Sequence, residues 1–300
     1  MSGITPKLRI LPMAVTAIVM GATASVAMAT EPCGDFGECK AIIEINSSDG
    51  DIGFHFLMDG DDLNFAMIYD PNGAKIFQDH AKGLLMEQKM TETFVESAEP
   101  LCWESPDAEE DDDIVTLEDF LDLWAAGEYV FIGSADEGEK SEGKTELTYM
   151  LPAAPDEESL EYDDATGVIS WEGGEDLGNC ADSARLTGLV GAGVLPVHPK
   201  DVTVDEWEVV LEPDVEDGDP LGSLVFSMRV AGDIGDITGL KVTVPPEYLG
   251  YFEPNTPGKI EVGAIGGNDN ATFTEVEICI NEDLDEDPLG CEEEEEGPED

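Results

Sequence analysis

Residues 138–145 read GEKSEGKT and match the phosphate-binding loop G-x-x-x-x-G-K-[ST]. That loop binds phosphate only where it follows a buried strand and opens a helix, whose N-terminal amides face the anion. Here the flanking runs are GEYVFIG and KTELTYML, and the second alternates apolar and polar residues as a strand does. The stretch is therefore predicted to lie in the tip of a β-hairpin, where Glu137, Glu139 and Glu142 would repel a nucleotide.

Other motifs of nucleophilic or metal-assisted catalysis are absent from the sequence, which has no G-x-S-x-G, no H-E-x-x-H and no C-x-x-C. Seventy carboxylates place many pairs close together by chance, so no pair can be assigned to acid–base catalysis. His55 is expected on the face of a strand, and His80 and His198 are expected in surface loops. We therefore predict no catalytic residues, and the protein is predicted not to be an enzyme.

Calcium is the cofactor that the acidic loops favour, because it takes six to eight oxygen ligands from flexible segments. The D-x-D-x-D run at 283–287 is the most suggestive, although Pro288 stands where an EF-hand loop needs glycine. Two further loops, at 216–219 and 59–62, can also be polar turns with acidic side chains. The predicted calcium ligands are Asp283, Asp285, Asp287, Asp217, Asp219, Asp59 and Asp61.

The charge balance is extreme: 70 Asp and Glu against 13 Lys and Arg give a formal net charge of -57. Nucleic acid and anionic membranes are recognised through clusters of Lys and Arg, so both are excluded as partners. Such a surface also stays soluble in concentrated salt, and a salty habitat would explain the acidity without any ligand.

The N-terminal residues 1–29 have the features of a secretory signal peptide. Lys7 and Arg9 precede the apolar run ILPMAVTAIVM, and Ala27-Met28-Ala29 forms a small-residue cleavage pattern. No later apolar run approaches the roughly 20 residues that a membrane-spanning helix needs. The mature chain is expected to start at Thr30 and to be exported, to the periplasm or the cell exterior.

Six cysteines remain after this cleavage, and an even number in an exported chain favours disulfides. Six cysteines allow 15 connectivities, of which the sequence supports only the local pairs Cys33–Cys39 and Cys279–Cys291. Cys102 and Cys180 are candidate disulfide residues, and Cys180 could anchor the loop in which it lies.

Apolar alternation predicts an all-β chain of two tandem β-sandwich domains, with the first at 30–151 and the second at 159–281. One short helix at 117–126 is expected in the first domain, because Thr116 and Asp119 form a capping pattern and Gly127 can end it. The proline-punctuated stretch 152–158 is predicted to be a linker. The acidic tail 282–300 is predicted to be disordered.

The second half of the chain has a succession of short strands with aromatic anchors, among them ISW, WEVVL, LKVTV and IEVGAI, closed by a glycine–asparagine turn. This succession resembles the fibronectin type III domain over residues 155–281, and the chain is also similar to a group of exported bacterial proteins that carry it. The residues that carry the resemblance are Trp171, Trp207, Leu240, Val242, Val244, Ile260, Val262 and Ala264.

The resemblance implies an immunoglobulin-like β-sandwich that presents loops for adhesion or assembly. Two positions depart from the family pattern. Gly258 stands where the family usually has a tyrosine, so the hydrogen bond of that tyrosine is expected to be absent or replaced. Residues 179–199 are expected to be an inserted loop.

These features favour a non-catalytic exported protein for binding, adhesion or surface assembly, with an extracellular protein or glycan as partner. A calcium-stabilised structural module is the first alternative. The second is a carbohydrate-binding accessory to a secreted hydrolase, which would need a platform of exposed aromatics such as Trp103 or Trp171. The sequence does not identify the ligand or the oligomeric state.

Overall fold

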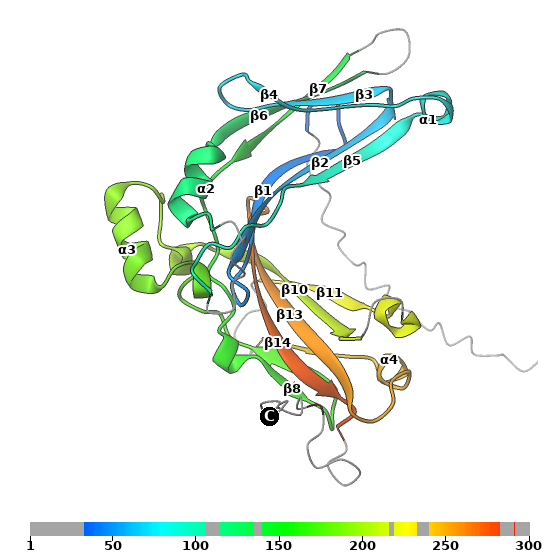
Figure 1. Ribbon diagram of the computed structural model, residues 1–300, viewed down its shortest axis with the longest axis vertical. Helices are drawn as coiled ribbons and strands as arrows, with labels where there is room; N and C mark the ends of the chain where they lie inside the picture. The colour runs from blue at the N-terminus through cyan, green and yellow to red at the C-terminus, as the bar shows by residue number, and fades with distance from the viewer. Residues whose placement is uncertain are drawn as a thin grey trace, which may run out of the picture. The chain divides into compact units, whose positions relative to one another are not determined.

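The protein is mostly β, with two β-sandwiches formed by three sheets (Figure 1). The computed structural model describes residues 33–105, 114–134, 140–215, 219–232, 240–282 and 291. The predicted signal peptide, Asp217, the run from Asp283 to Asp287 and most of the acidic tail lie outside these described residues.

The largest sheet has seven strands in the order β11-β10-β13-β14-β1-β2-β5. Neighbouring strands are antiparallel except β1 and β14, which run parallel. The strands are β1 (Glu38–Asn46), β2 (Asp51–Leu63), β5 (Met90–Glu96), β10 (Val204–Pro213), β11 (Phe226–Ala231), β13 (Thr256–Gly266) and β14 (Ala271–Ile280). Strands from the two predicted domains therefore share one sheet.

Two smaller sheets complete the sandwiches. The four-stranded sheet, in the order β4-β3-β6-β7, consists of β3 (Phe65–Tyr69), β4 (Lys75–His80), β6 (Gly127–Ser134) and β7 (Lys140–Leu147). The three-stranded sheet, in the order β12-β9-β8, consists of β8 (Glu161–Asp163), β9 (Val168–Trp171) and β12 (Leu240–Thr243). Because side chains alternate along each strand, the large sheet presents its apolar face to these two sheets and its polar face outward.

The first core fills the space between the four-stranded sheet and strands β1 and β2. Phe54 and Phe56 of β2 pack against Tyr129 and Phe131 of β6. Trp124 stacks on Phe54 with ring centroids 4.0 Å apart, which confirms a structural role for the helix that precedes it.

The second core lies between the three-stranded sheet and strands β10 and β13. Trp171 is 1% exposed and meets Trp207 edge to face, with ring centroids 6.0 Å apart, so both tryptophans are core residues. The Tyr248 hydroxyl lies 2.7 Å from the Leu211 carbonyl oxygen and 2.8 Å from that of Leu224. This hydroxyl supplies the kind of hydrogen bond that the glycine at 258 cannot make.

Among the described residues, four short α-helices connect the strands: α1 (Leu84–Gln88), α2 (Leu117–Leu123), α3 (Ser183–Ala192) and α4 (Pro246–Leu249). Helix α2 is the one that the sequence predicted, and Thr116 caps it by accepting a hydrogen bond from the Asp119 amide. Helix α3 lies within the stretch expected to be only a loop, so that expectation was incomplete. Asp182 caps its start, and Gly193 ends it in the left-handed conformation.

The GEKSEGKT stretch lies where the predicted hairpin places it, since β6 and β7 pair antiparallel. Residues 140–145 belong to strand β7 itself, rather than to the tip of the hairpin. The Lys144 ammonium pairs with Glu128 across the hairpin at 2.8 Å. A strand offers no helix N-terminus to a phosphate, so the nucleotide-binding interpretation fails on geometry as well as on charge.

The two sandwiches are joined at the parallel pair β1–β14 by buried polar side chains of β14 and of the residue just before it. Asn270, Thr272 and Thr274 are at most 1% exposed. Asn270 accepts a hydrogen bond from the Ile43 amide at 2.9 Å, and its own amide donates to the Thr148 carbonyl at 2.8 Å. These contacts make β14 a strand of both sandwiches.

The stretch predicted as a linker runs along this junction. Residues 151–155 are buried. The hydroxyls of Thr272 and Thr274 donate to the carbonyl oxygens of Pro152 and Pro155, each at 2.8 Å. The backbone between the sandwiches is therefore fixed by hydrogen bonds in its first half.

Three disulfides are present: Cys33–Cys39, Cys102–Cys180 and Cys279–Cys291. The two sequence-local pairs were predicted, and both are confirmed. The third bond, which the sequence left unassigned, links the segment after β5 to the segment that precedes α3.

Candidate functional site

The outer face of the seven-stranded sheet carries a concentration of acidic side chains, which we call the acidic face. Alternation places its members opposite the two cores, on strands from both sandwiches. The acidic face comprises Glu38 and Glu44 (β1), Asp51 (β2), Glu96 (β5), Glu99 just after β5, Glu206, Glu208 and Glu212 (β10), Glu261 (β13) and Glu275 (β14).

The acidic face is concave. Phe94 belongs to β5 and Arg229 to β11, the strands at opposite edges of the sheet, yet both side chains line one pocket together with Glu44 and His55. A neighbouring pocket is lined by Asp49, Asp51, Glu99, Glu261 and Glu275, among others. The curvature brings together carboxylates from strands that are not neighbours.

Three basic side chains on this face are each shared between two carboxylates. Lys40 lies 2.8 Å from Glu38 and 3.3 Å from Asp269. Lys259 lies 3.1 Å from Glu275 and 3.4 Å from Glu212. Arg229 pairs in the same way with Glu206 and Glu208, at 3.7 and 2.7 Å. Even the paired part of the face therefore keeps an excess of negative charge.

The centre of the face has no such compensation. Within the described part of the chain, no Lys or Arg forms an ion pair with Glu44, Asp51 or Glu261. Burial, followed by repulsion from Glu261 and Glu99, raises the pKa of Glu44 to about 7. Burial, followed by repulsion from Glu275, raises the pKa of Glu261 to about 7. Burial and the Glu99 charge raise the pKa of Asp51 to about 6. These carboxylates repel one another at neutral pH.

These pKa values predict that the protein loses stability as the pH rises. Between pH 4.5 and about 7 the folded protein keeps a proton on Glu261 that the unfolded chain releases. The stability that this proton contributes is therefore fully present below pH 4.5 and is lost as the pH rises through about 7. Glu261→Gln removes the charge, and we expect it to raise the free energy of unfolding at pH 8 by about 2 kcal/mol after allowance for solvent screening. At pH 5 the change should be small. Urea unfolding at both pH values measures it.

The control for this substitution is Glu172→Gln, which neutralises an exposed carboxylate outside the acidic face, just after β9. A Glu261→Gln protein that is less stable than wild type at pH 8, or a control that gains as much, would contradict the repulsion described here.

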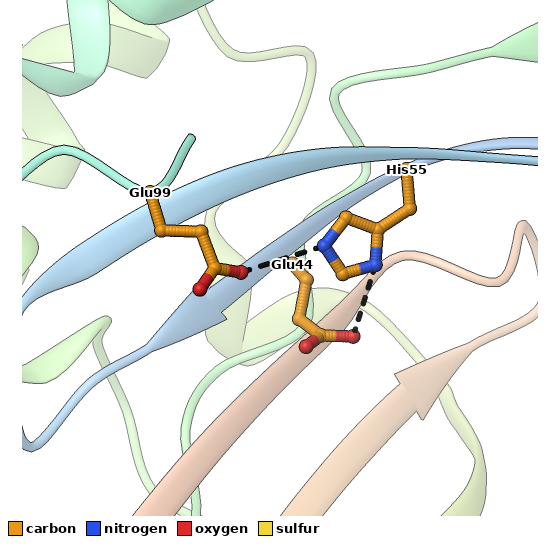
Figure 2. A group of neighbouring side chains, drawn as sticks. All are labelled: Glu44, His55 and Glu99. Carbon is orange, nitrogen blue, oxygen red and sulfur yellow. Dashed lines mark ion pairs between the residues drawn. The ribbon is translucent and has the colours of Figure 1, made fainter. Parts of the chain in front are cut away.

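His55 lies at the centre of the acidic face, surrounded by carboxylates (Figure 2). Its Nδ1 lies 3.8 Å from a Glu44 oxygen, and its Nε2 lies 3.5 Å from a Glu99 oxygen and 3.8 Å from a Glu96 oxygen. The sequence placed His55 on a strand face but did not indicate its partners, because Glu99 follows another strand. The side chain is buried, with only 6% of the residue exposed.

The predicted calcium ligands are not brought together with this cluster. Asp59 and Asp61 lie in strand β2, so the turn expected at 59–62 is wrong, and both are exposed. Asp219 caps a short 3-10 helix by accepting a hydrogen bond from the Leu221 amide at 2.8 Å. The other four lie outside the described residues, and calcium binding stays a prediction.

One serine–histidine pair resembles part of a catalytic triad. The Ser183 hydroxyl lies 3.4 Å from Nε2 of His198, which is buried rather than in a surface loop as expected. However, Nδ1 of His198 accepts a hydrogen bond from the Lys200 amide, so the neutral ring carries its proton on Nε2. That nitrogen cannot take the serine proton, and the pair lacks a general base.

Comparison with known proteins gave matches to solved structures only. No family model and no curated protein sequence matches the chain. A bacterial ice-binding adhesin, studied for its host cell surface retention, matches with 11% identity and a TM-score of 0.23, over 85% of this chain and 66% of the other. The BSP domain of a biofilm-associated protein matches with 11% identity and a TM-score of 0.22, over 86% and 31%.

A tandem repeat of a large adhesion protein matches with 10% identity and a TM-score of 0.22, over 81% of this chain and 50% of the other. The chain thus spans between about a third and two thirds of the length of these structures. In the described part of the chain, no helix is both long enough and apolar enough to cross a membrane.

Proposed function

We propose that the protein is a non-catalytic exported binding protein that serves adhesion or surface assembly, and that the acidic face is its binding surface. The observation that carries the proposal is the concave outer face of the shared sheet, to which both sandwiches contribute carboxylates. Concave surfaces with convergent polar groups are the usual form of a binding site.

The charge of this face selects the class of partner. Among the described residues, Glu44, Asp51 and Glu261 form no ion pair with Lys or Arg, so a cationic ligand would relieve a repulsion that the free protein retains. Complementary charge gives specificity and fast association. We infer that the partner is an extracellular protein that presents a Lys- or Arg-rich segment.

Two further features support the proposal. Three disulfides suit an oxidising compartment outside the cytoplasm. Seven strands, β8 to β14, surround the second core, three in the small sheet and four in the shared sheet, and this number supports the fibronectin type III interpretation and its adhesive role.

The alternative function, a carbohydrate-binding accessory to a secreted hydrolase, is not supported by the positions of Trp103 and Trp171. Trp171 is in the second core. Trp103 packs against the first core, and its indole nitrogen donates to the Asp49 carbonyl oxygen at 2.9 Å. Neither side chain offers the open platform on which a sugar ring would stack.

Neutralising the acidic face should weaken binding of a cationic probe. We expect the triple variant Glu208→Gln, Glu261→Gln, Glu275→Gln to bind an oligolysine peptide about tenfold more weakly, a loss of about 1.4 kcal/mol. Isothermal titration of the mature protein at physiological salt measures the affinity. Three substitutions of equal charge outside the face, Glu157→Gln, Glu158→Gln and Glu172→Gln, form the control, because all three residues are exposed. Equal losses in both triple variants would show that only net charge attracts the peptide.

A further inference from the structure

The imidazole of His55 has a buried nitrogen without a hydrogen-bond partner. Nε2 is inaccessible to solvent and makes no hydrogen bond, and only 6% of the residue is exposed. Leaving such an atom unpaired costs about 1–3 kcal/mol. The ring is held in place, since Phe94 meets it edge to face with centroids 5.7 Å apart. The nitrogen faces the carboxylates of Glu99 and Glu96 and is available to a ligand.

The distances from Nε2 to the neighbouring carboxylate oxygens are too long for direct hydrogen bonds, but they suit atoms that bind one metal ion together. A hydrogen bond from imidazole to carboxylate spans about 2.7–3.2 Å, whereas Nε2 lies 3.5 Å from Glu99 and 3.8 Å from Glu96. Around a tetrahedral ion with bonds of about 2.1 Å, ligand atoms lie about 3.4 Å apart. One ligand atom each from Glu44, His55 and Glu99 lies within 4.8 Å of the others. Glu44 approaches the ring from the Nδ1 side, at 3.8 Å, so its carboxylate must turn toward Nε2 to complete the shell.

Gly53 leaves the space in which these groups meet. It lies directly opposite Glu44 in the β1–β2 register. A Cβ atom at this position would lie 2.8 Å from Oε1 of Glu99 and 3.1 Å from Nε2 of His55. The absence of a side chain at Gly53 lets the Glu99 carboxylate approach the imidazole.

The donor set selects the class of ion. Calcium and magnesium prefer oxygen ligands alone, whereas zinc and other divalent first-row metals accept imidazole nitrogen together with carboxylate oxygen. We propose that Glu44, His55 and Glu99 bind a divalent transition-metal cation, of which zinc is the representative. Three protein ligands leave a coordination position for water or for Glu96, the remaining carboxylate beside Nε2.

This metal site is distinct from the predicted calcium loops and does not depend on the peptide-binding role of the acidic face. A bound dication would also lower the repulsion among Glu44, Glu99 and Glu261, and it would stabilise the folded chain by an amount that grows with the logarithm of the metal concentration above the Kd.

Zinc titration in excess calcium tests the proposal. We expect the metal-free mature protein to bind one equivalent of zinc, measured by isothermal titration at physiological salt with calcium present to occupy oxygen-only sites. His55→Gln should weaken zinc binding by more than about tenfold, the loss that even an outer-shell partner can cause. His80→Gln is the matched control, because His80 is exposed at the end of β4, and it should bind zinc as the wild type does.

Gly53→Ala gives a second test in which all three proposed ligands are kept. A thermal melt of each variant verifies that the variant folds. This substitution should also weaken zinc binding by about tenfold or more, because its methyl group displaces the Glu99 carboxylate from His55. If His55→Gln does not fold, Gly53→Ala decides the question.

Equal zinc affinity in the decisive variant and in His80→Gln would overturn the site, and so would zinc uptake that excess calcium abolishes. The oligolysine assay is performed in chelator, so loss of the zinc site and failure of the peptide-binding proposal give separate results.

Discussion

Replacing Cys102 and Cys180 together with alanine is expected to destabilise the protein by about 4.5 kcal/mol, the largest loss among the disulfides. The bond closes a loop between residues 78 apart in sequence, and the chain-entropy cost of an open loop in the unfolded state grows with its length. Both sulfurs are buried, at 1% and 0% exposure of their residues. Urea unfolding of the mature protein measures the change as a shift in midpoint at constant slope.

The Cys33–Cys39 bond is the matched control, since its cysteines are also buried but lie only 6 residues apart. The same relation gives about 2.3 kcal/mol for Cys33→Ala with Cys39→Ala. Removal of Cys102–Cys180 should therefore cost about twice as much. Equal losses in the two double variants would contradict an origin in loop closure.

The sequence predicts the strands of each sandwich because their alternation is local. Runs such as ECKAIIEIN and DEWEVVLEP alternate with a period of two, and the structure has β1 and β10 at these places. Helix α2 was predictable from Thr116 and Leu117 for the same reason. Helix α3 was missed, although Asp182 before an apolar repeat and Gly193 after it are recognisable helix boundaries.

The shared sheet could not be predicted, because it depends on pairing between residues far apart in the chain. Glu44 aligns with Ala271 in the parallel pair, and no local pattern indicates that β1 and β14 are neighbours. The acidic face follows from this pairing. Among seventy carboxylates the sequence cannot show that Glu44 and Glu261 lie near each other, nor that Gly53 leaves room beside His55.

Asn270→Ala is expected to destabilise the protein by about 3–5 kcal/mol, because the side chain satisfies three backbone groups from two segments at once. Its oxygen accepts from the Ile43 amide, and its nitrogen donates to the carbonyl oxygens of Thr148 and Met150 at 2.8 and 3.3 Å. The residue is 0% exposed, so water cannot replace these bonds. Each buried group left unpaired costs about 1–3 kcal/mol.

The matched control is Asn268→Ala, two residues earlier in the turn before β14. Asn268 donates to the Thr148 hydroxyl at 2.8 Å and is partly exposed, so water can replace its partner and the loss should be about 1 kcal/mol or less. Both free energies come from urea unfolding under the same conditions. If Asn270→Ala lowered the free energy of unfolding no more than this control does, the Asn270 side chain would not be what holds the two sandwiches together. A large difference would show that Asn270 stabilises the junction between β1, which carries Glu44, and β14, which carries Glu275.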